Sequence, residues 1–318
     1  MLFLPASASA AGGVSAFYYP WYGTPGADGV FEHWQQDGHE PPLTIASNYW
    51  PARGVYSSSN ALVLNSQMTE IKRAGITDVA VSWWGWGSAE DQRLPAVIRA
   101  ARAQKLTVSV HIEPYADRTP ETVEADIGHL RKLGVTTFYV YRPFEVPAAD
   151  WAAVNDRLTG VRVLAQTGLV GQAAAGHFEG VYTYDVLVYG AESFARTCQQ
   201  AHAAGLLCAP SVGPGYDARA AVGDQRVKPR RAGTTYDAMW QAALAAGADL
   251  ITITSYNEWH EGTQIEPAQP RPGYDSYRGA WGLSGPRAET SYLDRTTTWS
   301  RLYAICLALK RGTGMLAP

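Results

Sequence analysis

Glu258 and Glu261 are the side chains of this sequence with the clearest capacity for chemistry. They follow the β-branched run from Ile251 to Thr254, which is typical of a packed strand. Such a strand has no structural need for carboxylates at its end, where burying a charge costs free energy. If the chain turns helically there, the two Cβ atoms lie about 5 to 6 Å apart. Both carboxylates can then reach one bond, and their repulsion raises the pKa of one of them, which separates an acid from a base.

Glycoside hydrolysis uses such a pair of carboxyl groups. One group protonates the departing oxygen, and the other acts as a nucleophile or as a base. The sequence also contains 11 Trp and 18 Tyr but only 7 Phe, so most of its large rings carry a polar group beside an apolar face. Such faces can hold a pyranose ring. The alternative interpretation of two acidic loop residues is a solvated surface turn.

Two other hydrolytic chemistries are not supported by the sequence. The segment that starts at His260 differs from the zinc-binding motif HExxH, because Gln264 stands where the second His is required. A serine hydrolase motif GxSxG is absent. Cys198, Cys208 and Cys306 lack CxxC spacing and predict neither a zinc site nor a dense disulfide framework, although one bridge, for example between Cys198 and Cys208, stays open. We predict no metal and no cofactor.

The elements that must position these side chains are eight strands that alternate with helices. Apolar or alternating runs predict strands at residues 14–19, 76–83, 107–113, 136–141, 161–167, 178–184, 206–212 and 249–255. Helical spacing occurs at residues 61–74, 91–104, 120–133, 191–204 and 235–245, and Gly75, Gly134, Gly205 and Gly247 mark helix ends. This alternation predicts a parallel sheet with right-handed crossovers. Eight units in one domain favour a closed (β/α)8 TIM barrel over an open doubly wound sheet.

Chemistry-bearing residues follow six of the predicted strands. They occupy residues 18–23, 82–86, 111–115, 182–184, 213–217 and 256–261. Catalytic groups of a TIM barrel lie at the carboxyl ends of its strands. Taken singly, a Trp pair is more often part of a core, and a lone His such as His111 is more often structural. Their shared placement at one end of the strands favours a site, and the aromatic stretch from Pro20 to Asn60 is expected to wall it.

Composition limits the partners and the location. With 318 residues, 46% of them hydrophobic, the chain can bury one large core, and we assign residues 13–318 to a single catalytic domain and predict a monomer. A net charge of −3 without a Lys/Arg run argues against nucleic acid. No stretch reaches the roughly 20 apolar residues of a membrane span. Residues 1–12 resemble the end of a secretory signal, which predicts a secreted protein, with a cytosolic N-terminus as the alternative.

The sequence resembles the endo-α-mannosidases of glycoside hydrolase family 99. The resemblance covers nearly the whole chain and rests on FYYPWYGTP at 17–25, the His33-Trp34 pair, YSS at 56–58, SWWG at 82–85, HIEPYADR at 111–118, GVYTY at 180–184, PSVGPGYD at 210–217 and NEWHEGTQIEP at 257–267. The last motif is long and highly specific. The resemblance implies a retaining (β/α)8 enzyme that cuts inside glycans at α-1,2-mannosidic bonds and needs no metal for catalysis.

The resemblance also implies roles for individual residues. Glu258 would take the proton of the substrate's own 2-hydroxyl, which forms a 1,2-anhydro sugar, and Glu261 would protonate the leaving oxygen and later activate water. Glu266 and His260 would support the site. Positions expected around the sugar are Tyr18, Tyr22, His33, Trp84, His111, Glu113, Tyr184 and Asn257. The implied partner is an oligosaccharide or polysaccharide such as an α-mannan.

Two segments depart from the family pattern. The loop after Tyr184 is shorter than expected, and Asp217 is followed by Ala218-Arg219-Ala220 instead of a basic and aromatic continuation. The resemblance implies that both loops help to form the rim of the cleft. The sequence therefore supports the bond-cleaving chemistry better than it supports the identity of the substrate. Hydrolysis of a different α-linked glycan, a non-catalytic glycan-binding barrel and a protein of polysaccharide assembly are the alternatives.

Overall fold

The computed structural model describes residues 12–312, and side chains are described up to Lys310. The leader predicted for residues 1–12 therefore lies, apart from Gly12, outside the described residues. Within residues 12–312, no helix combines the length and the apolar character that crossing a bilayer requires.

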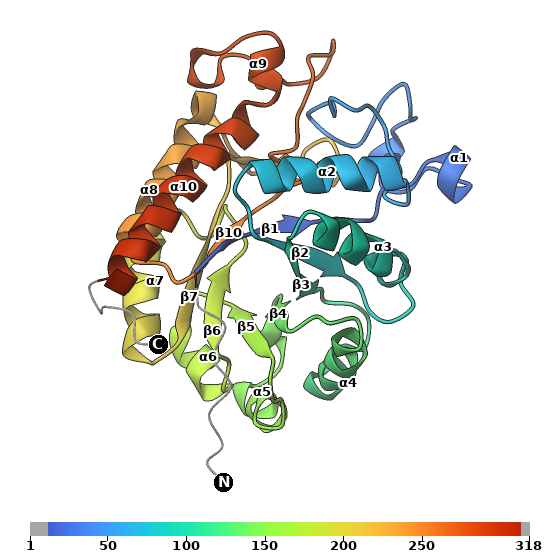
Figure 1. Cartoon of the computed structure of the whole chain (residues 1–318). Helices are drawn as coiled ribbons and strands as arrows, with labels where there is room; N and C mark the ends of the chain where they lie inside the picture. The colour runs from blue at the N-terminus through green and yellow to red at the C-terminus, as the bar shows by residue number, and fades with distance from the viewer. Residues whose placement is uncertain (1–11, 313–318) are drawn as a thin grey trace.

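Eight parallel strands close into a barrel, as the alternation of strands and helices predicts (Figure 1). The strands are β1 (Val14–Tyr18), β2 (Asp78–Trp83), β3 (Thr107–Ile112), β4 (Thr137–Val140), β5 (Arg162–Gln166), β6 (Gly180–Thr183), β7 (Leu207–Val212) and β10 (Ile251–Ile253). Neighbours in the barrel follow chain order, and closure pairs β1 with β10 through Val14 and Ile251. Each strand lies within its predicted segment, so the TIM barrel prediction is confirmed.

Helices surround the barrel on its outer side (Figure 1). They are α2 (Ala61–Arg73), α3 (Ala89–Ala103), α4 (Pro120–Arg131), α5 (Ala148–Asn155), α6 (Val170–Ala175), α7 (Ala191–Ala203), α8 (Thr234–Ala245) and α10 (Ser291–Gly312), whereas the four-residue helices α1 (Pro25–Asp28) and α9 (Pro286–Glu289) lie in connecting loops. Short 3-10 turns occur at Gln36–Gly38, Pro143–Glu145, Arg231–Gly233 and Ala280–Gly282, and β8 (Tyr216–Asp217) pairs with β9 (Val227–Lys228) in a separate hairpin. Gly75 after α2 has a φ of 77°, a left-handed conformation that favours glycine at a helix end.

Alternate residues of each strand fill the barrel. Phe17 lies inside, with its ring centroid 4.6 Å from that of His111 and 5.8 Å from that of Tyr182. At the amino-terminal end of the strands, Asp78 accepts hydrogen bonds from Ser15 and Ser109. Because successive side chains of a strand point to opposite faces, residues two positions beyond these inward side chains face the open end of the barrel.

The long segment between β1 and α2 is fastened to the barrel by Arg93 of α3. Its guanidinium donates to the Pro20 carbonyl at 3.0 Å and to Asp28 at 3.1 Å, and it also pairs with Glu32. Cations that bind several acceptors at once hold a loop in one arrangement better than a single exposed ion pair does. This segment therefore forms a fixed side of the barrel's carboxyl end.

Candidate active site

The two glutamates lie in the turn that follows β10, and Glu258 is held by its own loop. Its Oε1 accepts a hydrogen bond from the backbone N–H of His260 at 3.1 Å, and its Oε2 accepts one from the backbone N–H of Glu261 at 3.1 Å. The N–H of Glu258 donates to Ser255 Oγ at 2.8 Å. Two N–H donors on one carboxylate stabilise its ionised form and fix its position.

Glu261 has a different environment. It is partly exposed, and Tyr184 donates its hydroxyl to Glu261 Oε2 at 3.3 Å. The hydroxyls of Tyr184 and Tyr19 form a short hydrogen bond with each other. Two hydrogen-bonded tyrosines, which directly follow β1 and β6, therefore lead to the Glu261 carboxyl group.

The pKa values of both glutamates are raised. Burial is the largest cause for each, and repulsion from Glu261 adds to the rise at Glu258. Burial together with the charge of Asp185 raises the pKa of Glu261 to about 8. The pair consequently keeps a proton at neutral pH. The two backbone donors oppose the rise at Glu258 and so favour its ionised form within the pair.

His111 and Glu113 form a second polar wall at the end of β3. Both side chains are buried, with His111 Nδ1 3.0 Å from Glu113 Oε1 and His111 Nε2 2.8 Å from the hydroxyl of Tyr182. Ser82 donates to Glu113 Oε1 at 2.8 Å. The ring of His111 stacks against Tyr184 at 5.2 Å, which joins this wall to the tyrosine on Glu261.

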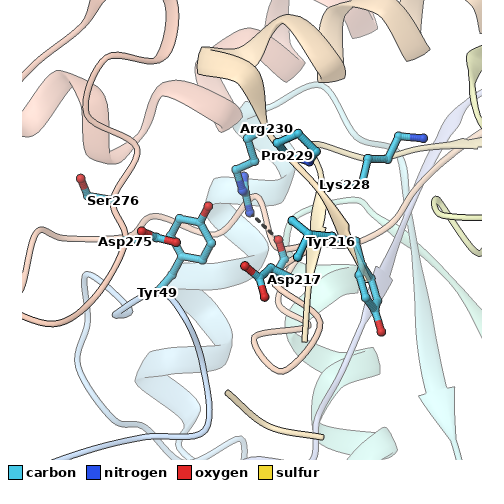
Figure 2. Close-up of a pocket in the computed structure, with 10 residues that line it drawn as sticks. Tyr49, Tyr216, Asp217, Lys228, Pro229, Arg230, Asp275 and Ser276 are labelled. Atoms are coloured by element: carbon cyan, nitrogen blue, oxygen red, sulfur yellow. Dashed lines mark hydrogen bonds between the residues drawn. The ribbon is translucent and has the colours of Figure 1, made fainter. Parts of the chain in front are cut away.

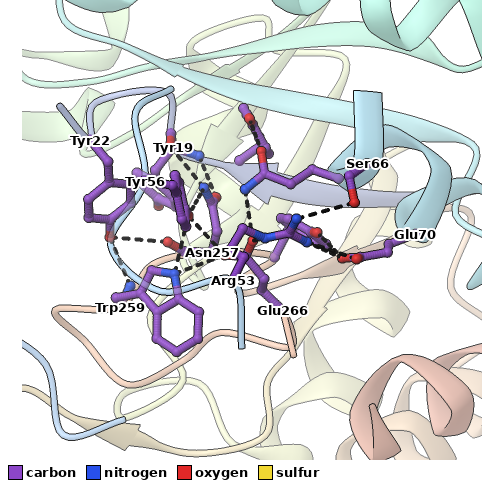
Figure 3. Close-up of polar contacts among 12 residues, drawn as sticks. Tyr19, Tyr22, Arg53, Tyr56, Ser66, Glu70, Asn257, Trp259 and Glu266 are labelled. Carbon is purple, nitrogen blue, oxygen red and sulfur yellow. Dashed lines mark hydrogen bonds and ion pairs between the residues drawn. The ribbon is translucent and has the colours of Figure 1, made fainter. Parts of the chain in front are cut away.

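A buried network lies behind the glutamates (Figure 3). Glu266 is fully buried and accepts hydrogen bonds from Arg53 Nε at 2.7 Å and Gln67 Nε2 at 2.8 Å on one oxygen. Its other oxygen accepts from the Tyr56 hydroxyl at 2.8 Å and from Trp259 Nε1 at 2.9 Å. A buried charge with this many donors is compensated, so the network fixes the loop that carries Glu258.

Asn257 and Tyr22 hold the backbone on both sides of Glu258. The Asn257 side chain accepts from the N–H of Tyr19 at 2.8 Å and donates to the Tyr19 carbonyl at 3.0 Å. The Tyr22 hydroxyl donates to the Asn257 carbonyl at 3.1 Å and accepts from the N–H of Trp259 at 3.0 Å. These two predicted sugar-binding residues therefore lie at the site with their polar groups engaged by the protein (Figure 3).

His33 and His260 form an uncharged aromatic edge. The His33 ring stacks on Trp21 at 4.5 Å, and the His33 carbonyl is 2.6 Å from His260 Nε2. Burial lowers the pKa of His33 to about 3 and that of His260 to about 4. Both imidazole rings are therefore neutral near pH 7, so they contribute aromatic surface to the site and no positive charge.

Tyr18 lies apart from the other predicted residues. Its hydroxyl donates to Gln67 of α2 at 2.6 Å, and its ring stacks on Tyr256, so it points into the layer between strand and helices. Tyr19, one residue later, reaches Tyr184. Tyr19 falls in the segment 18–23 but was not among the individual residues expected around the sugar, and neither was Tyr141, whose ring lies 5.4 Å from that of His111 and 5.2 Å from that of Tyr184. Alternation along β1 from the inward-facing Phe17 identifies Tyr19. Trp84, 39% exposed, follows β2 at the same end of the barrel.

A cavity of about 250 Å³ borders the loop of Glu261 (Figure 2). The N–H of Asp217 donates to the Glu261 carbonyl at 2.7 Å. Arg230 Nη2 donates to the carbonyls of Gly262 and Gln264 at 2.9 and 2.7 Å, and its guanidinium lies over the ring of Tyr49 at 4.7 Å. Asp217 of β8 and Arg230, which follows β9, thus hold the backbone of residues 261–264.

Among the described residues, no group of three His, Cys, Asp or Glu side chains is arranged to hold a metal ion. The chemistry that these groups can perform is proton transfer between one ionised and one protonated carboxyl group, beside the rings of Tyr19, Tyr184 and His111. A (β/α)8 barrel with such a pair after its last strand is the architecture of a retaining or inverting glycosidase.

Comparisons with known proteins agree with this class. The sequence matches glycosyl hydrolase family 99 over residues 11–305, so the chain belongs to that family and is a glycosidase. It is 30% identical to a glycoprotein endo-alpha-1,2-mannosidase-like protein of Danio rerio, over 92% of this chain and 78% of the relative. It is also 30% identical to the glycoprotein endo-alpha-1,2-mannosidase of Mus musculus, over 91% and 74%. The solved GH99 endo-alpha-mannosidase of Bacteroides thetaiotaomicron superimposes with a TM-score of 0.82 at 28% identity, over 92% of this chain and 98% of that one. The resemblance seen in the sequence is confirmed.

Proposed function

We propose that this glycosidase cleaves internal α-1,2-mannosidic bonds in mannans or mannose-rich glycans and retains the anomeric configuration. The relatives named as endo-alpha-1,2-mannosidases support the bond, since they match about nine-tenths of the chain. The unequal environments of Glu258 and Glu261 carry the chemical part of the proposal. A carboxylate with two N–H donors suits a base, and a carboxyl group that keeps its proton near pH 7 suits an acid.

The first step uses the substrate's own oxygen as the nucleophile. In an α-mannoside the 2-hydroxyl is anti to the leaving group, so its oxygen can attack the anomeric carbon from behind. Glu258 takes the proton of that hydroxyl as the new C–O bond forms, and Glu261 gives its proton to the departing oxygen as the glycosidic bond breaks. The product of this step is a 1,2-anhydro sugar.

The second step restores both glutamates. Glu261, now ionised, takes a proton from water as the water oxygen attacks the anomeric carbon. The anhydro ring opens, and Glu258 returns its proton to the 2-oxygen. Two displacements at one carbon give net retention.

The remaining site residues divide into two groups. We assign contact with sugar to Trp84, His111, Glu113, Tyr184 and Tyr19. We assign positioning of the glutamate loop to Tyr22, Asn257, His33, Glu266 and Tyr18, because their hydrogen bonds lead to the backbone or side chains of residues 257–260, directly or through Gln67 and Glu266.

The test is product analysis with Glu261→Gln beside the unaltered enzyme. We expect the enzyme to release short oligosaccharides from an α-mannan, with the retained anomer seen first by NMR. Loss of an acid catalyst typically costs about 10²- to 10⁴-fold in rate. Glu121→Gln, an exposed glutamate on α4, is the matched control and should keep full activity. Undiminished turnover by Glu261→Gln would refute the assignment, and an initially inverted product would exclude the two-step route.

A substrate that lacks the 2-hydroxyl at the cleaved mannose tests the internal nucleophile. The proposed route predicts no turnover of this 2-deoxy compound, because the attacking oxygen is missing. An enzyme that used a glutamate as its nucleophile would still cleave it. Rapid hydrolysis of the 2-deoxy substrate would therefore overturn the role given to Glu258.

We also propose that the protein works outside the cytoplasm. Cys198 of α7 and Cys208 of β7 form a disulfide, and both side chains are buried. Disulfides persist in oxidising compartments and are rare in reducing ones. Fractionation of the source cells, with thiol counting on the recovered protein, tests this location. Recovery of a fully reduced protein from the cytosolic fraction would contradict it.

A further inference from the structure

Trp86 is presented to solvent by the loop between β2 and α3. Its side chain is 65% exposed, although burying a ring of this size would be strongly favourable. The flanking residues Gly85 and Gly87 both have left-handed φ values, 101° and 83°. Side chains other than glycine rarely adopt this conformation, so the backbone here is specifically shaped to project the ring outward.

The exposed ring is held in place from behind. His129 of α4 stacks on Trp86 with ring centroids 4.2 Å apart and planes 18° from parallel. His129 Nε2 lies 3.0 Å from Asp91 Oδ1, and the other Asp91 oxygen accepts the N–H of Gly87 at 2.9 Å. Asp91 Oδ1 also accepts from the indole N–H of the buried Trp83 at 2.9 Å. One carboxylate therefore ties the loop, the backing ring and the barrel together.

The place of Trp86 relates it to the active site. It follows β2 at the same end of the barrel as Glu258 and Glu261, two residues beyond the partly exposed Trp84. Helices α3 and α4, which carry Asp91 and His129, lie next to each other on this side of the barrel (Figure 1). A single exposed apolar residue is ordinary on a protein surface. Trp86 differs from such a residue because its ring lies between two glycines in left-handed conformations and is stacked on His129.

We propose that Trp86, backed by His129, is an outer sugar-binding platform that holds a pyranose ring of the glycan chain away from the bond that is cut. The apolar face of a pyranose matches a flat exposed indole, and fixing the indole beforehand reduces the entropy lost on binding. This inference rests on the proposed function, since it assumes a glycan long enough to reach from the glutamates to the loop. If Trp86 binds such a distant sugar, the enzyme should prefer polymeric substrates to short ones.

The kinetic test compares two substrates of different length. For Trp86→Ala we expect KM for an α-mannan polysaccharide to rise about 3- to 10-fold, the usual range for one aromatic contact. The efficiency on a short manno-oligosaccharide should change less than twofold. Trp86→Phe should restore most of the loss, and His129→Ala should give an intermediate rise in KM because the indole loses its support.

A matched control separates the platform from general surface effects. Leu62→Ala removes another exposed apolar side chain, 80% exposed on α2, and should leave both efficiencies unchanged. Retention of the inactive Glu261→Gln enzyme in gels that contain the α-mannan gives a second readout without turnover. Adding Trp86→Ala to that variant should weaken the retention, whereas adding Leu62→Ala should not.

The outcomes distinguish the platform from the proposed function. Equal KM and equal retention for Trp86→Ala and Leu62→Ala, in an enzyme that cleaves α-mannan, would overturn the platform and leave the function standing. Failure of the unaltered enzyme to cleave any mannan would overturn the function. Retention that still depended on Trp86 in that case would support the platform as a glycan site.

Discussion

Replacing both Glu258 and Glu261 by Gln should make the free energy of unfolding less sensitive to pH. In the unfolded chain both carboxyl groups are ionised above about pH 5.5, because their ordinary pKa is 4.5. In the folded protein burial raises both pKa values, with that of Glu261 at about 8. Between pH 5.5 and 7 the folded site therefore holds at least one proton that the unfolded chain does not.

The sign and size of the effect follow from proton linkage. A carboxyl group with a raised pKa in the folded state stabilises the protein less as pH rises from the unfolded pKa to the folded one. One extra bound proton lowers the free energy of unfolding by about 1.4 kcal/mol per pH unit. Between pH 5.5 and 7 the free energy of unfolding of the unaltered protein should fall by about 2 kcal/mol relative to that of the double variant. Because burial is the largest cause of the raised pKa at each glutamate, either single variant should keep part of the slope and the double variant should lose it.

Urea unfolding at several pH values and constant ionic strength measures this difference. All other titrating groups occur in both proteins, so their contributions cancel when the variant is compared with its parent. A Glu40→Gln and Glu121→Gln double variant, which alters two exposed glutamates, should parallel the unaltered protein. Parallel curves for Glu258→Gln/Glu261→Gln and its parent would refute the argument that the site stores a proton.

Four further predictions concern the disulfide, the buried network around Glu266 and the proton on Glu261. Replacing Cys198 and Cys208 by Ala should lower the free energy of unfolding by about 3 kcal/mol, as expected for a disulfide that closes a loop of this length. Urea unfolding measures this loss, and an unchanged unfolding midpoint would contradict the prediction. Glu266→Gln should lower the free energy of unfolding by about 3 kcal/mol, because it breaks the buried ion pair with Arg53. The kcat of this variant should fall as well. An unchanged free energy of unfolding would count against the proposed role of the network. The kcat/KM of the unaltered enzyme should fall above about pH 8 as Glu261 loses its proton. Since the Tyr184 hydroxyl lowers that pKa, Tyr184→Phe should move the fall to higher pH, and a move to lower pH would be evidence against the contact.

The barrel was predictable because its signals are local. Each strand shows its apolar run within a few residues, and glycines such as Gly75 and Gly247 end the preceding helices. The shorter helices α5 (Ala148–Asn155) and α6 (Val170–Ala175) were missed, because segments of six to eight residues show too little of the helical period to be recognised. Tertiary packing, not local propensity, stabilises helices of that length.

The site was predictable in its position but not in all of its contacts. Glu258 and Glu261 follow the last strand, and chain order alone places them at the carboxyl end of the barrel. To decide whether Tyr18 or Tyr19 points toward the site, one must know which side chains of β1 face the inside of the barrel. Alternation along the strand gives the answer once Phe17 is known to lie inside. The bonds from Arg53 and Gln67 to Glu266 join residues about 200 positions apart, and no local pattern encodes them.

The pairing of β1 with β10 has a consequence for biosynthesis. A ribosome delivers Val14 long before Ile251, so the first strand waits with one edge unpaired while the rest of the barrel emerges. Asn257 can bind the backbone of Tyr19 only after that closure. Competence for hydrolysis should thus arise in one late event near the end of translation, and a nascent chain stalled before residue 251 would be inert whatever its degree of compaction.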